Sequence, residues 1–476
     1  MPRIFINGHP VEAEKGQTVL QAALAHGFFI PYFCWHPALS VSGNCRICAV
    51  EVEGEDLDIA CNMPVHEGMR VLTDSEAVQV WRKRMMQFIT LNHPVDCGIC
   101  DKAGECTLQD YHYEYNGEPS VSREPKVHAT KFFRLSARVL IDNERCILCS
   151  RCVRFTHEVS RSRALGIQNR ADSSLVRASE DGRFEDDPYS DNVIDLCPVG
   201  ALFSPSLLYR HRVWYLQATP SVCPGCSRGC TVRIWHRRPD WALHALDGRQ
   251  NESIARVTPL ESPAVNGPWI CNKGRDLARI FERPRAEQAM LKGEPVALDA
   301  AVEAARRLLE GARRPVALVS SWGSNEELEA FQRAFGGRVR AFVKEDSAPA
   351  PGETVEDDLL IRADKNPNTA AARALFGDVP PVFEEGTDLL LVWGEGLDFS
   401  RLPPRVPIIY LNAYLQPENG HADVFLPVSV QTERAGHYTN FQGVVSAFEP
   451  CFAKRDSVAH AEALFAALAS PAGLRP

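Results

Sequence analysis

Cysteine is the residue type in this sequence that most clearly indicates chemistry. Fifteen of the sixteen cysteines, together with one histidine, form four sets of four along the chain. Ligand group 1 is Cys34, Cys45, Cys48 and Cys61; ligand group 2 is His93, Cys97, Cys100 and Cys106; ligand group 3 is Cys146, Cys149, Cys152 and Cys197; and ligand group 4 is Cys223, Cys226, Cys230 and Cys271. Each set supplies the four soft ligands that one iron–sulfur cluster requires. The sixteenth cysteine, Cys451, stands alone and is predicted to pack as a small hydrophobic residue.

The spacing within ligand group 3 separates iron–sulfur clusters from zinc. In the run Cys146-x2-Cys149-x2-Cys152 three thiolates share one short loop, and the remote Cys197 is followed by proline. This spacing is typical of ferredoxin-type four-iron sites, whereas structural zinc often joins two Cys-x2-Cys pairs. We therefore predict iron–sulfur clusters and keep a zinc-binding interaction scaffold as the alternative from a different class. A brown protein would exclude that alternative.

The composition is that of a large globular protein. With 476 residues, of which 45% are hydrophobic and 24% charged, the chain is predicted to fold into roughly three to five domains. Disulfide scaffolds belong to small secreted domains, and the N-terminal residues lead into a strand rather than an apolar signal segment. The net charge of −9 argues against a nucleic-acid partner.

No stretch of about 18 apolar residues is available to span a membrane, so a membrane link would come through other subunits.

The elements expected around ligand group 1 form a small sheet with a helix. Arg3–Ile6 and Val11–Ala13 read as a hairpin around Asn7-Gly8, and Thr18–His26 reads as a helix ended by glycine. Ala49–Glu53 and Leu57–Cys61 read as two further strands. This arrangement resembles the two-iron ferredoxin fold, although the first gap between cysteines is longer than in the plant type.

A helix is expected to carry the histidine of ligand group 2. Residues Ser75–His93 have an apolar stripe at helical spacing, namely Val78, Trp81, Met85 and Ile89. His93 is expected on the same face, with Pro94 ending the helix. Such a histidine is more often a core residue. Here only three cysteines follow it, so we assign it as the fourth ligand, whose neutral ring raises the potential of a cluster relative to four thiolates.

The region between the cysteine groups is expected to be less regular. Gly117–Thr130 reads as a linker, and Ala171–Asn192 reads as a mostly exposed excursion with a solvated acidic run, Glu185 to Asp187. Trp235 and Trp241 are expected to be core aromatic residues.

From about Val296 onward the pattern becomes that of an α/β domain. Helices are expected at Asp299–Leu309 and after a capping box, Ser324 to Glu327. The expected strands are Pro315–Ser320, Arg338–Val343, Asp388–Trp393 and Val406–Leu411, which should form a parallel sheet. Glu345–Asp357 reads as a flexible insertion. Gly394-x-Gly396 lacks the third glycine of a dinucleotide-binding motif, so the chain is not expected to take electrons from a nicotinamide itself.

The four ligand groups, in this order, resemble the large iron–sulfur subunit of respiratory complex I, the NADH–quinone oxidoreductase of bacteria. The resemblance covers about residues 1–290, and includes Ile141 to Arg145 and Arg151 beside ligand group 3. Ligand group 4 resembles an additional four-iron site of some bacterial members. Cys271-Asn272-Lys273-Gly274-Arg275 is similar to the Cys-x-Lys-Gly-Arg of molybdopterin enzymes, where the lysine lies between cluster and pterin.

The resemblance implies an α+β multidomain chain with one two-iron cluster at ligand group 1 and four-iron clusters at the other three groups. It implies these domains: 1–76, a β-grasp two-iron ferredoxin-like domain; 77–116, a helical four-iron segment with one histidine and three cysteine ligands; 117–215, a four-iron ferredoxin-like domain; 216–285, a molybdopterin-oxidoreductase-type four-iron domain; and 286–476, a truncated α/β domain of the same type.

The resemblance also implies a function. The chain would pass electrons from an NADH- and FMN-binding flavoprotein subunit, through ligand groups 1, 3 and 2 in that order, toward quinone-side iron–sulfur subunits of a cation-pumping complex. It would be peripheral, on the cytoplasmic side of the cell membrane, and ligand group 4 would stabilise the fold. Alternatives within the oxidoreductases are a subunit of a soluble NAD-linked formate dehydrogenase or hydrogenase.

The C-terminal region departs from the family pattern. Only about 200 residues follow ligand group 4, where the family usually has several hundred. Asn419 to Pro427 and Glu433 to Asn440 resemble its later segments, as if the middle were deleted. Neither a complete pterin pocket, nor a bound molybdopterin, nor catalysis by molybdenum or tungsten is expected, and Lys273 is expected to be structural.

Overall fold

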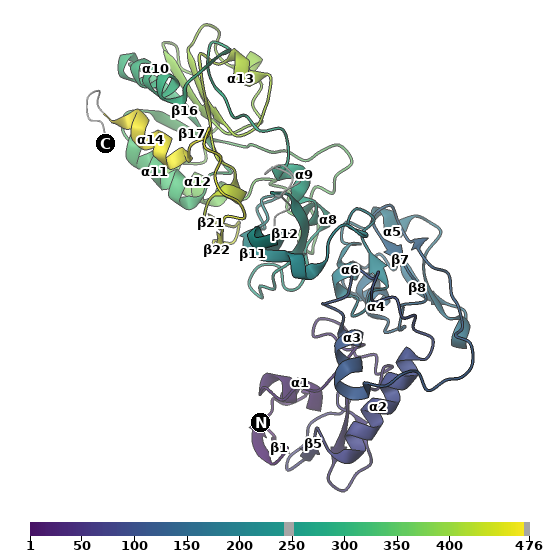
Figure 1. Ribbon diagram of the computed structural model, residues 1–476. Coiled ribbons are helices and arrows are strands. Elements are labelled where there is room, and N and C mark those ends of the chain that lie inside the picture. Colours follow the sequence, from purple (N-terminus) through teal and green to yellow (C-terminus); the bar gives the residue numbers. More distant parts are fainter. Residues whose placement is uncertain (242–251, 471–476) are drawn as a thin grey trace. The chain divides into compact units, whose positions relative to one another are not determined.

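The computed structural model describes residues 1–241 and 252–470, which divide into two compact units at Tyr215 and Leu216 (Figure 1). Each unit is described by itself. Within the described residues no helix is both long and apolar enough to cross a bilayer.

The N-terminal unit begins with a five-stranded mixed sheet in the order β2-β1-β5-β3-β4. Its strands are β1 (Arg3–Ile6), β2 (His9–Glu12), β3 (Ala49–Val52), β4 (Asp58–Ile59) and β5 (Arg70–Leu72). Asn7 and Gly8 have positive φ angles of 49° and 82°, as a two-residue hairpin turn requires. Helix α1 (Val19–Ala25) begins with a capping box from Thr18 and buries Val19 and Leu20 against the sheet. The expected hairpin, helix and strands are therefore present, each within a few residues of its predicted bounds.

The helix before ligand group 2 is shorter than predicted. Helix α2 spans Glu76–Thr90, so His93 lies beyond its end rather than on its face. Proline disfavours helical geometry in the residue before it, which accounts for His93 but not for the end of the helix at Thr90. The buried face of α2 also differs, because it consists of Val78, Arg82 and Met86. Helix α3 (Thr107–Tyr111) and a π-helical turn, η1 (His112–Asn116), follow.

Short elements build the rest of the N-terminal unit. They are the strands β6 (Phe133–Arg134), β7 (Leu140–Ile141), β8 (Leu165–Gln168), β9 (Leu175–Ala178) and β10 (Leu202–Phe203), the helices α4 (Arg151–Glu158), α5 (Arg183–Asp186) and α6 (Asn192–Leu196), and the 3₁₀ turns η2 (Ala171–Ser173) and η3 (Val213–Tyr215). The prediction of a solvated acidic run at Glu185 to Asp187 was wrong for Asp187. This residue is 3% exposed, and its carboxylate accepts hydrogen bonds from Ser160 and Ser162.

The C-terminal unit begins with a three-stranded antiparallel sheet, β11-β12-β13, made of β11 (Leu216–Val222), β12 (Thr231–Arg237) and β13 (Ile254–Pro259). The turn η4 (Pro239–Trp241) follows β12, and the helices α8 (Asn272–Arg275) and α9 (Leu277–Phe281) follow β13. Trp235 is half-buried and donates a hydrogen bond to Thr258. Trp241 is 50% exposed, so the prediction that it is a core residue was wrong.

A seven-stranded sheet forms the rest of the C-terminal unit, in the order β15-β14-β20-β19-β18-β16-β17. Its five parallel strands are β16 (Pro315–Ser320), β17 (Arg340–Lys344), β18 (Leu389–Trp393), β19 (Ile408–Asn412) and β20 (Val424–Pro427), and the antiparallel β14 (Ala289–Leu291) and β15 (Glu294–Val296) extend one edge. The parallel sheet predicted from the sequence is therefore confirmed.

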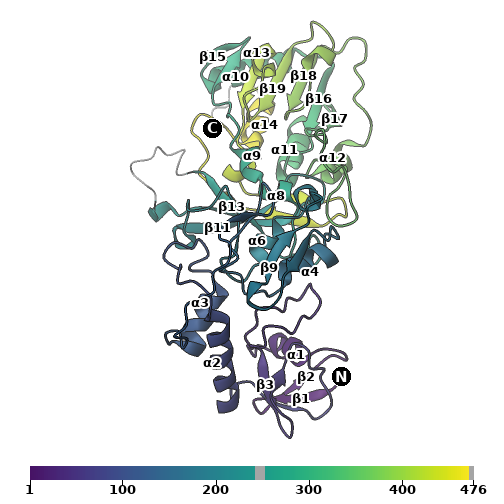
Figure 2. The ribbon, with the colours of Figure 1, turned by 90° about the vertical axis from the view of Figure 1, so that its right-hand side faces the viewer.

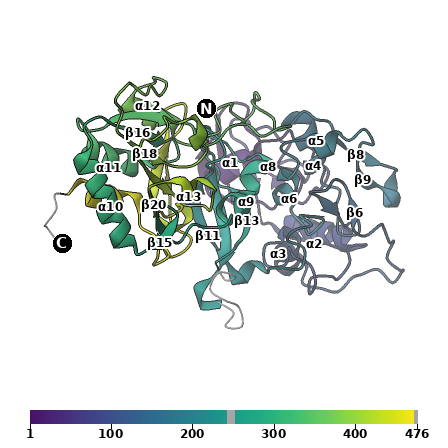
Figure 3. The same cartoon turned by 90° about the horizontal axis from the view of Figure 1, so that it is seen from above.

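One layer of helices covers one face of this sheet, as Figures 2 and 3 show for α10 and α11. Besides α8 and α9, the helices described in this unit are α10 (Leu298–Gly311), α11 (Asn325–Phe335), α12 (Thr369–Phe376), α13 (Glu418–His421) and α14 (Ala461–Ala469). Two 3₁₀ turns, η5 (Phe399–Arg401) and η6 (Gln431–Glu433), and the hairpin of β21 (Gly436–Thr439) and β22 (Val445–Phe448) complete the described elements. On the other face a second apolar core includes Phe342, Tyr410 and Phe425. The predicted capping box of α11 is present, with Ser324 and Glu327 bonding each other's backbone amides.

Candidate metal centres

Ligand group 1 lies in the long loop between α1 and β3 and at the end of β4. Cys34, Cys48 and Cys61 are each 1% exposed, and the Cys34 amide donates to Cys45 Sγ at 3.5 Å. A hydrogen bond from the Cys45 thiol lowers the pKa of Cys34 to about 5, while the pKa of Cys45 is raised by that bond and by burial. The pKa of Cys48 is raised in the same way, by a hydrogen bond with Cys61 and by burial. The four thiols thus form two contacting pairs, in which Cys45 alone is half-buried.

Ligand group 2 gathers His93 and three cysteines in the irregular segment after α2. Burial is the main cause that lowers the pKa of His93 to about 4, with smaller contributions from Lys126 and Arg145. The ring is therefore neutral at pH 7, the state in which imidazole binds metals. Its Nδ1 atom is buried, and no described residue forms a hydrogen bond with it. A buried nitrogen without a partner costs free energy, so this ring fits a ligand role better than a core role.

The three cysteines of ligand group 2 differ in exposure. Cys100 and Cys106 are buried, and burial raises the pKa of each thiol, whereas Cys97 is exposed. Lys126 lies beside this segment, where its ammonium group donates to the carbonyls of Leu91 and His93 at 3.0 and 2.7 Å. These bonds satisfy backbone groups that the early end of α2 leaves free.

Ligand group 3 is formed by the loop before α4, by α4 itself and by Cys197 at the end of α6. Its three-cysteine loop has positive φ angles at Leu148 and Ser150, and Cys152 already lies in α4. Burial raises the pKa of Cys149 to about 11, and repulsion from the Cys197 thiolate adds to the shift. Burial also raises the pKa of Cys152, and the other three thiols of the group add to that shift by the same repulsion. All four sulfurs are therefore close enough to repel one another as thiolates, a repulsion that bound iron would remove.

Ligand group 4 joins the β11–β12 turn to the start of α8. The Cys223 amide donates to the Cys230 carbonyl at 2.8 Å, and Gly225 donates to Cys223 Sγ at 3.4 Å. A Cβ atom on Gly274 would lie 3.4 Å from Cys223 Sγ and 3.9 Å from Cys271 Sγ, so this backbone packs against both sulfurs. Burial raises the pKa of Cys271 to about 11. The other three thiols of the group add, by repulsion, to the raised pKa of Cys230, so the four sulfurs lie close together and offer the donor set that a cluster requires.

Two arginines of α4 connect ligand group 3 to ligand group 1. Arg151 donates to the Trp35 carbonyl at 2.6 Å, and Arg154 donates to the carbonyls of Cys34 and Ser40. Arg154 also donates to the Cys149 carbonyl in ligand group 3, at 3.4 Å. Sequence reasoning noted Arg151 but missed Arg154, for which the local sequence carries no signal because its partners are more than a hundred positions away.

Ligand group 3 also adjoins ligand group 2. The Thr107 amide, next to Cys106, donates to the Pro198 carbonyl at 3.1 Å. A Cβ atom on Gly200 would lie 2.2 Å from Cys100 Sγ, so this backbone passes directly against a sulfur of ligand group 2. Arg145, beside Cys146, bonds Asp96, beside Cys97, at 2.9 Å. Within the N-terminal unit, ligand group 3 therefore lies between the other two.

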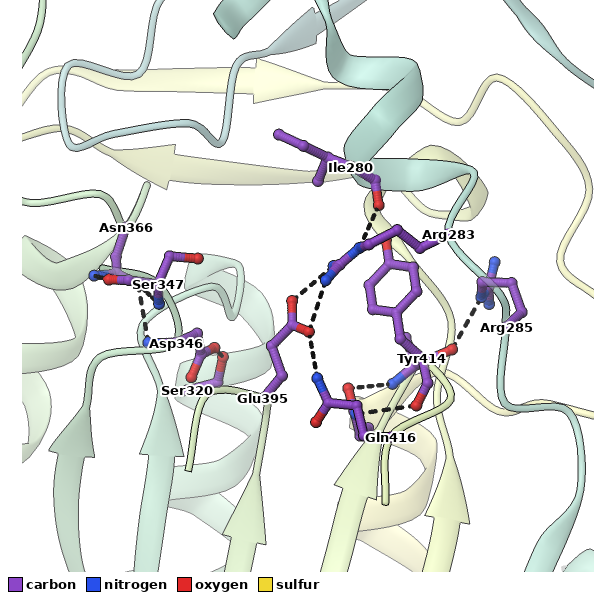
Figure 4. A network of polar contacts seen from close by, with 12 residues as sticks. Ile280, Arg283, Arg285, Ser320, Asp346, Ser347, Asn366, Glu395, Tyr414 and Gln416 are labelled. Atoms are coloured by element: carbon purple, nitrogen blue, oxygen red, sulfur yellow. Dashed lines mark hydrogen bonds and ion pairs between the residues drawn. The ribbon is translucent and has the colours of Figure 1, made fainter. Parts of the chain in front are cut away.

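The glycine pair Gly394 and Gly396 lies where parallel α/β sheets usually bind ligands, at the carboxyl ends of strands beside a reversal in strand order. Here the protein's own groups fill much of that position (Figure 4). A Cβ atom on Gly394 would lie 2.6 Å from Asp346 Oδ2, and Asp346 bonds Lys344 and Ser320. A cavity of about 70 Å³ remains, lined in part by Trp393 and Tyr414.

A second part of the same network is visible in Figure 4. Arg283 binds Glu395 through two hydrogen bonds of 2.9 and 2.7 Å, and Glu395 also accepts one from Gln416 at 2.9 Å. The Arg283 guanidinium lies 3.8 Å from the centre of the Tyr414 ring. These contacts tie the loops after β18 and β19 to the segment after α9.

The unassigned cysteine, Cys451, is not brought to any ligand group. It is half-buried, its amide donates to the Thr432 carbonyl at 2.8 Å, and burial raises the pKa of its thiol to about 12. This environment suits a packed thiol.

Four protein-family models match the chain in sequence. They are the 2Fe-2S iron-sulfur cluster binding domain at residues 2–76, the NADH-ubiquinone oxidoreductase-G iron-sulfur binding region at 82–119, the ferredoxin-like domain of NADH-quinone oxidoreductase subunit 3 at 136–203, and the molybdopterin oxidoreductase Fe4S4 domain at 216–283. Each matched range contains one complete ligand group. Both two-iron and four-iron cluster types are therefore represented.

Curated relatives with similar sequences are also iron–sulfur proteins or subunits of NADH oxidoreductases. The mitochondrial NADH dehydrogenase [ubiquinone] iron-sulfur protein 1 of Solanum tuberosum is 36% identical over 291 residues, which is 61% of this chain and 37% of the relative. The NADH-ubiquinone oxidoreductase 75 kDa subunit of Reclinomonas americana is 37% identical over 293 residues, 61% of this chain and 40% of the relative. The chain therefore resembles the large iron–sulfur subunit of NADH–quinone oxidoreductase over about three fifths of its own length. It spans about two fifths of the length of these two relatives.

A longer alignment exists with a protein of another name. The NADPH-Fe(3+) oxidoreductase subunit alpha of Geobacter sulfurreducens is 33% identical over 341 residues, 70% of this chain and 38% of the relative. The alignment with this relative extends over more of the chain than those with the two relatives named above.

Proposed function

We propose that this chain is the electron-transfer subunit of a bacterial NADH:quinone oxidoreductase. The observation that carries the proposal is the contact of ligand group 3 with ligand groups 1 and 2, through Arg154 on one side and through Gly200 and Pro198 on the other. Electron tunnelling needs redox centres that are close together, and the contacts of ligand group 3 with its two neighbours support such a spacing.

We assign the ligands residue by residue. Ligand group 1 would hold a two-iron cluster, and ligand groups 2, 3 and 4 would each hold a four-iron cluster. When bound, these clusters accept and donate single electrons, which is the redox chemistry that the polypeptide lacks.

The side chains around the ligands position and poise the centres. His93 supplies a neutral donor in place of a thiolate, which raises the potential of the centre that forms there. Arg151 and Arg154 place positive charge beside buried thiolates and hold two ligand loops at a fixed separation. Burial of Cys34, Cys48 and Cys61 limits the access of water to three of the four sulfurs of ligand group 1.

The partners follow from the same proposal. A flavoprotein subunit that binds NADH and FMN would donate electrons to ligand group 1, and iron–sulfur subunits on the quinone side would accept them from ligand group 2. The chain would sit at the cytoplasmic face of the cell membrane, bound to membrane subunits. We assign ligand group 4, which lies in the other unit, to stabilising the fold.

Isolation of the tagged chain from gently solubilised membranes tests the proposal. We expect a flavoprotein subunit and several polytopic membrane subunits to copurify with it. Recovery of soluble partners alone would overturn the proposal. It would favour a second candidate, the electron-transfer subunit of a soluble NAD(P)H-linked oxidoreductase, to which the longer Geobacter alignment points.

A further inference from the structure

Lys273 lies directly beside ligand group 4. It follows Cys271 by two positions and lies in α8. A Cβ atom on Gly225 would lie 3.4 Å from Cys223 Sγ, and 3.6 and 3.7 Å from Cδ and Cγ of Lys273. The lysine stem and the cysteine sulfur therefore pack against the same glycine, which brings the lysine side chain to the edge of the ligand group.

The ammonium group of Lys273 is held by a carboxylate from a distant segment. Its Nζ donates to Glu353 Oε1 at 2.8 Å. The other oxygen, Oε2, accepts a hydrogen bond from the Ala350 amide at 3.0 Å. The Glu353 side chain is only 20% exposed, so its carboxylate is fixed in orientation and partly shielded from solvent.

A second lysine fixes the backbone around Glu353. Lys365, whose side chain is 1% exposed, donates to the carbonyls of Thr354 and Val355 at 3.0 and 2.8 Å. Its Nζ also lies 3.5 Å from Glu353 Oε1. The region predicted as a flexible insertion, Glu345–Asp357, is thus held by hydrogen bonds from Lys365 to its backbone.

The residues that follow this segment, up to Lys365, are bonded to the loop of ligand group 4. The Ser227 amide, next to Cys226, donates to the Asp364 carbonyl at 2.8 Å. Arg228 donates to the Leu359 carbonyl at 3.0 Å. Lys365, which contacts Glu353, directly follows Asp364, which is bonded to the cysteine loop. Glu353 is therefore held in place by the same contacts that join this region to ligand group 4.

We propose that Glu353 is a positioning residue that holds the Lys273 ammonium beside ligand group 4 and so sets the reduction potential of the cluster bound there. The inference rests on the proposed function only in requiring a cluster at this group. Reduction adds negative charge to a cluster, so a nearby cation raises its potential and a nearby anion lowers it. The carboxylate offsets part of the lysine charge and keeps the potential lower than the lysine alone would.

The test is a potentiometric titration of the full-length purified chain, followed by electron paramagnetic resonance. The signal of ligand group 4 is identified as the one lost in Cys226→Ser. In Glu353→Gln we expect that signal to titrate at a higher potential, by about a tenfold change in the equilibrium constant, which for a one-electron couple is about 59 mV. Lys273→Met should shift it in the opposite direction.

Two further variants separate charge from structure. Glu353→Asp keeps the charge and should retain most of the native potential. Glu356→Gln removes a carboxylate of the same segment that pairs with Arg362 at 2.8 Å rather than with Lys273, and it should shift the potential less. An unshifted potential in Glu353→Gln, with iron content unchanged, would overturn the inference. Absence of any signal that depends on Cys226 in the native protein would instead overturn the assignment of a cluster to ligand group 4.

Discussion

Gly200 illustrates how a single residue can determine whether two ligand groups fit together. It has an ordinary negative φ angle, so its backbone conformation does not require glycine. What requires glycine is the space, because a Cβ atom would lie 2.2 Å from Cys100 Sγ and 3.1 Å from Lys102 Cβ. The first distance is far below van der Waals contact. Either the Pro198–Gly200 backbone or the sulfur would have to move.

Gly200→Ala should therefore weaken the binding of the cluster at ligand group 2 while leaving those at ligand groups 1 and 4 in place. Iron content and the paramagnetic signals of the individual clusters measure this effect. The matched control is Gly166→Ala, since a Cβ atom there meets nothing within 4 Å. A Gly200→Ala protein with a full set of native signals would show that the loop relaxes at no cost.

His36 is a second residue with a measurable consequence, in this case for pH dependence. Burial, followed by the charges of Arg151 and Arg154, lowers the pKa of His36 to about 4. Its Nδ1 accepts a hydrogen bond from the Ala38 amide at 3.2 Å, which requires the neutral ring. In the unfolded chain the ring takes up a proton near pH 6.5.

Between about pH 6.5 and pH 4 the unfolded chain therefore binds more protons at His36 than the folded chain, so the free energy of unfolding falls as the pH falls. At about pH 5.5 the loss should be about 1 kcal/mol relative to about pH 7.5. His36→Gln should lack this part of the pH dependence when unfolding of the N-terminal unit is compared at the two pH values. An identical pH dependence in the variant would contradict the assignment.

At the scale of elements, sequence patterns predicted helices and strands correctly where the stabilising contacts are between residues close together in the sequence. Pro315–Ser320 is a strand with the bounds that its apolar run indicated, and Ser324 with Glu327 forms the predicted capping box. The predicted end of α2 was wrong, because the helix ends at Thr90, three residues before the position at which Pro94 disfavours helical geometry. The buried position of Arg82 on α2 had no local signal, since the apolar stripe pointed to its neighbours.

Ser324→Ala should lower the stability of α11 by about 1 kcal/mol, because it removes the side-chain acceptor for the Glu327 amide. Hydrogen exchange of the α11 amides measures this loss. Thr18→Ala removes the equivalent cap of α1 in the other unit and should affect α1 amides alone. Equal exchange of α11 in the native and Ser324→Ala proteins would show that tertiary packing alone sets its stability.

At the scale of the whole molecule, residues 77–215 rely on a different source of stability from the C-terminal unit. The C-terminal unit has two extended apolar cores on the faces of its seven-stranded sheet. Much of residues 77–215 consists of short elements between ligand loops, and ligand group 3 adjoins both of its neighbours there. The division of the ligands into four groups was readable from the sequence. The placement of ligand group 3 between the others was not, because it depends on contacts such as Arg154 with Cys34 that span 120 positions.

Removal of iron by a chelator under reducing conditions should therefore act unequally. We expect amides around ligand groups 2 and 3 to lose protection from hydrogen exchange, because clustered buried thiols lose the metal that offsets their repulsion. Amides of β16, β18 and β19 should remain protected. Comparable loss in both regions would show that the seven-stranded sheet also depends on the clusters.

The span of the contact between Arg154 and Cys34 has a consequence for biosynthesis. A ribosome adds about 5 to 20 residues per second, so roughly ten seconds pass between the emergence of Cys34 and that of the arginine that holds its carbonyl. During this interval the thiols of ligand group 1 are already present, but the hydrogen bond from Arg154 of α4 to the Cys34 carbonyl cannot yet form. We expect cluster insertion at this loop to follow the synthesis of α4, and the nascent chain to be most easily damaged by oxidants before that point.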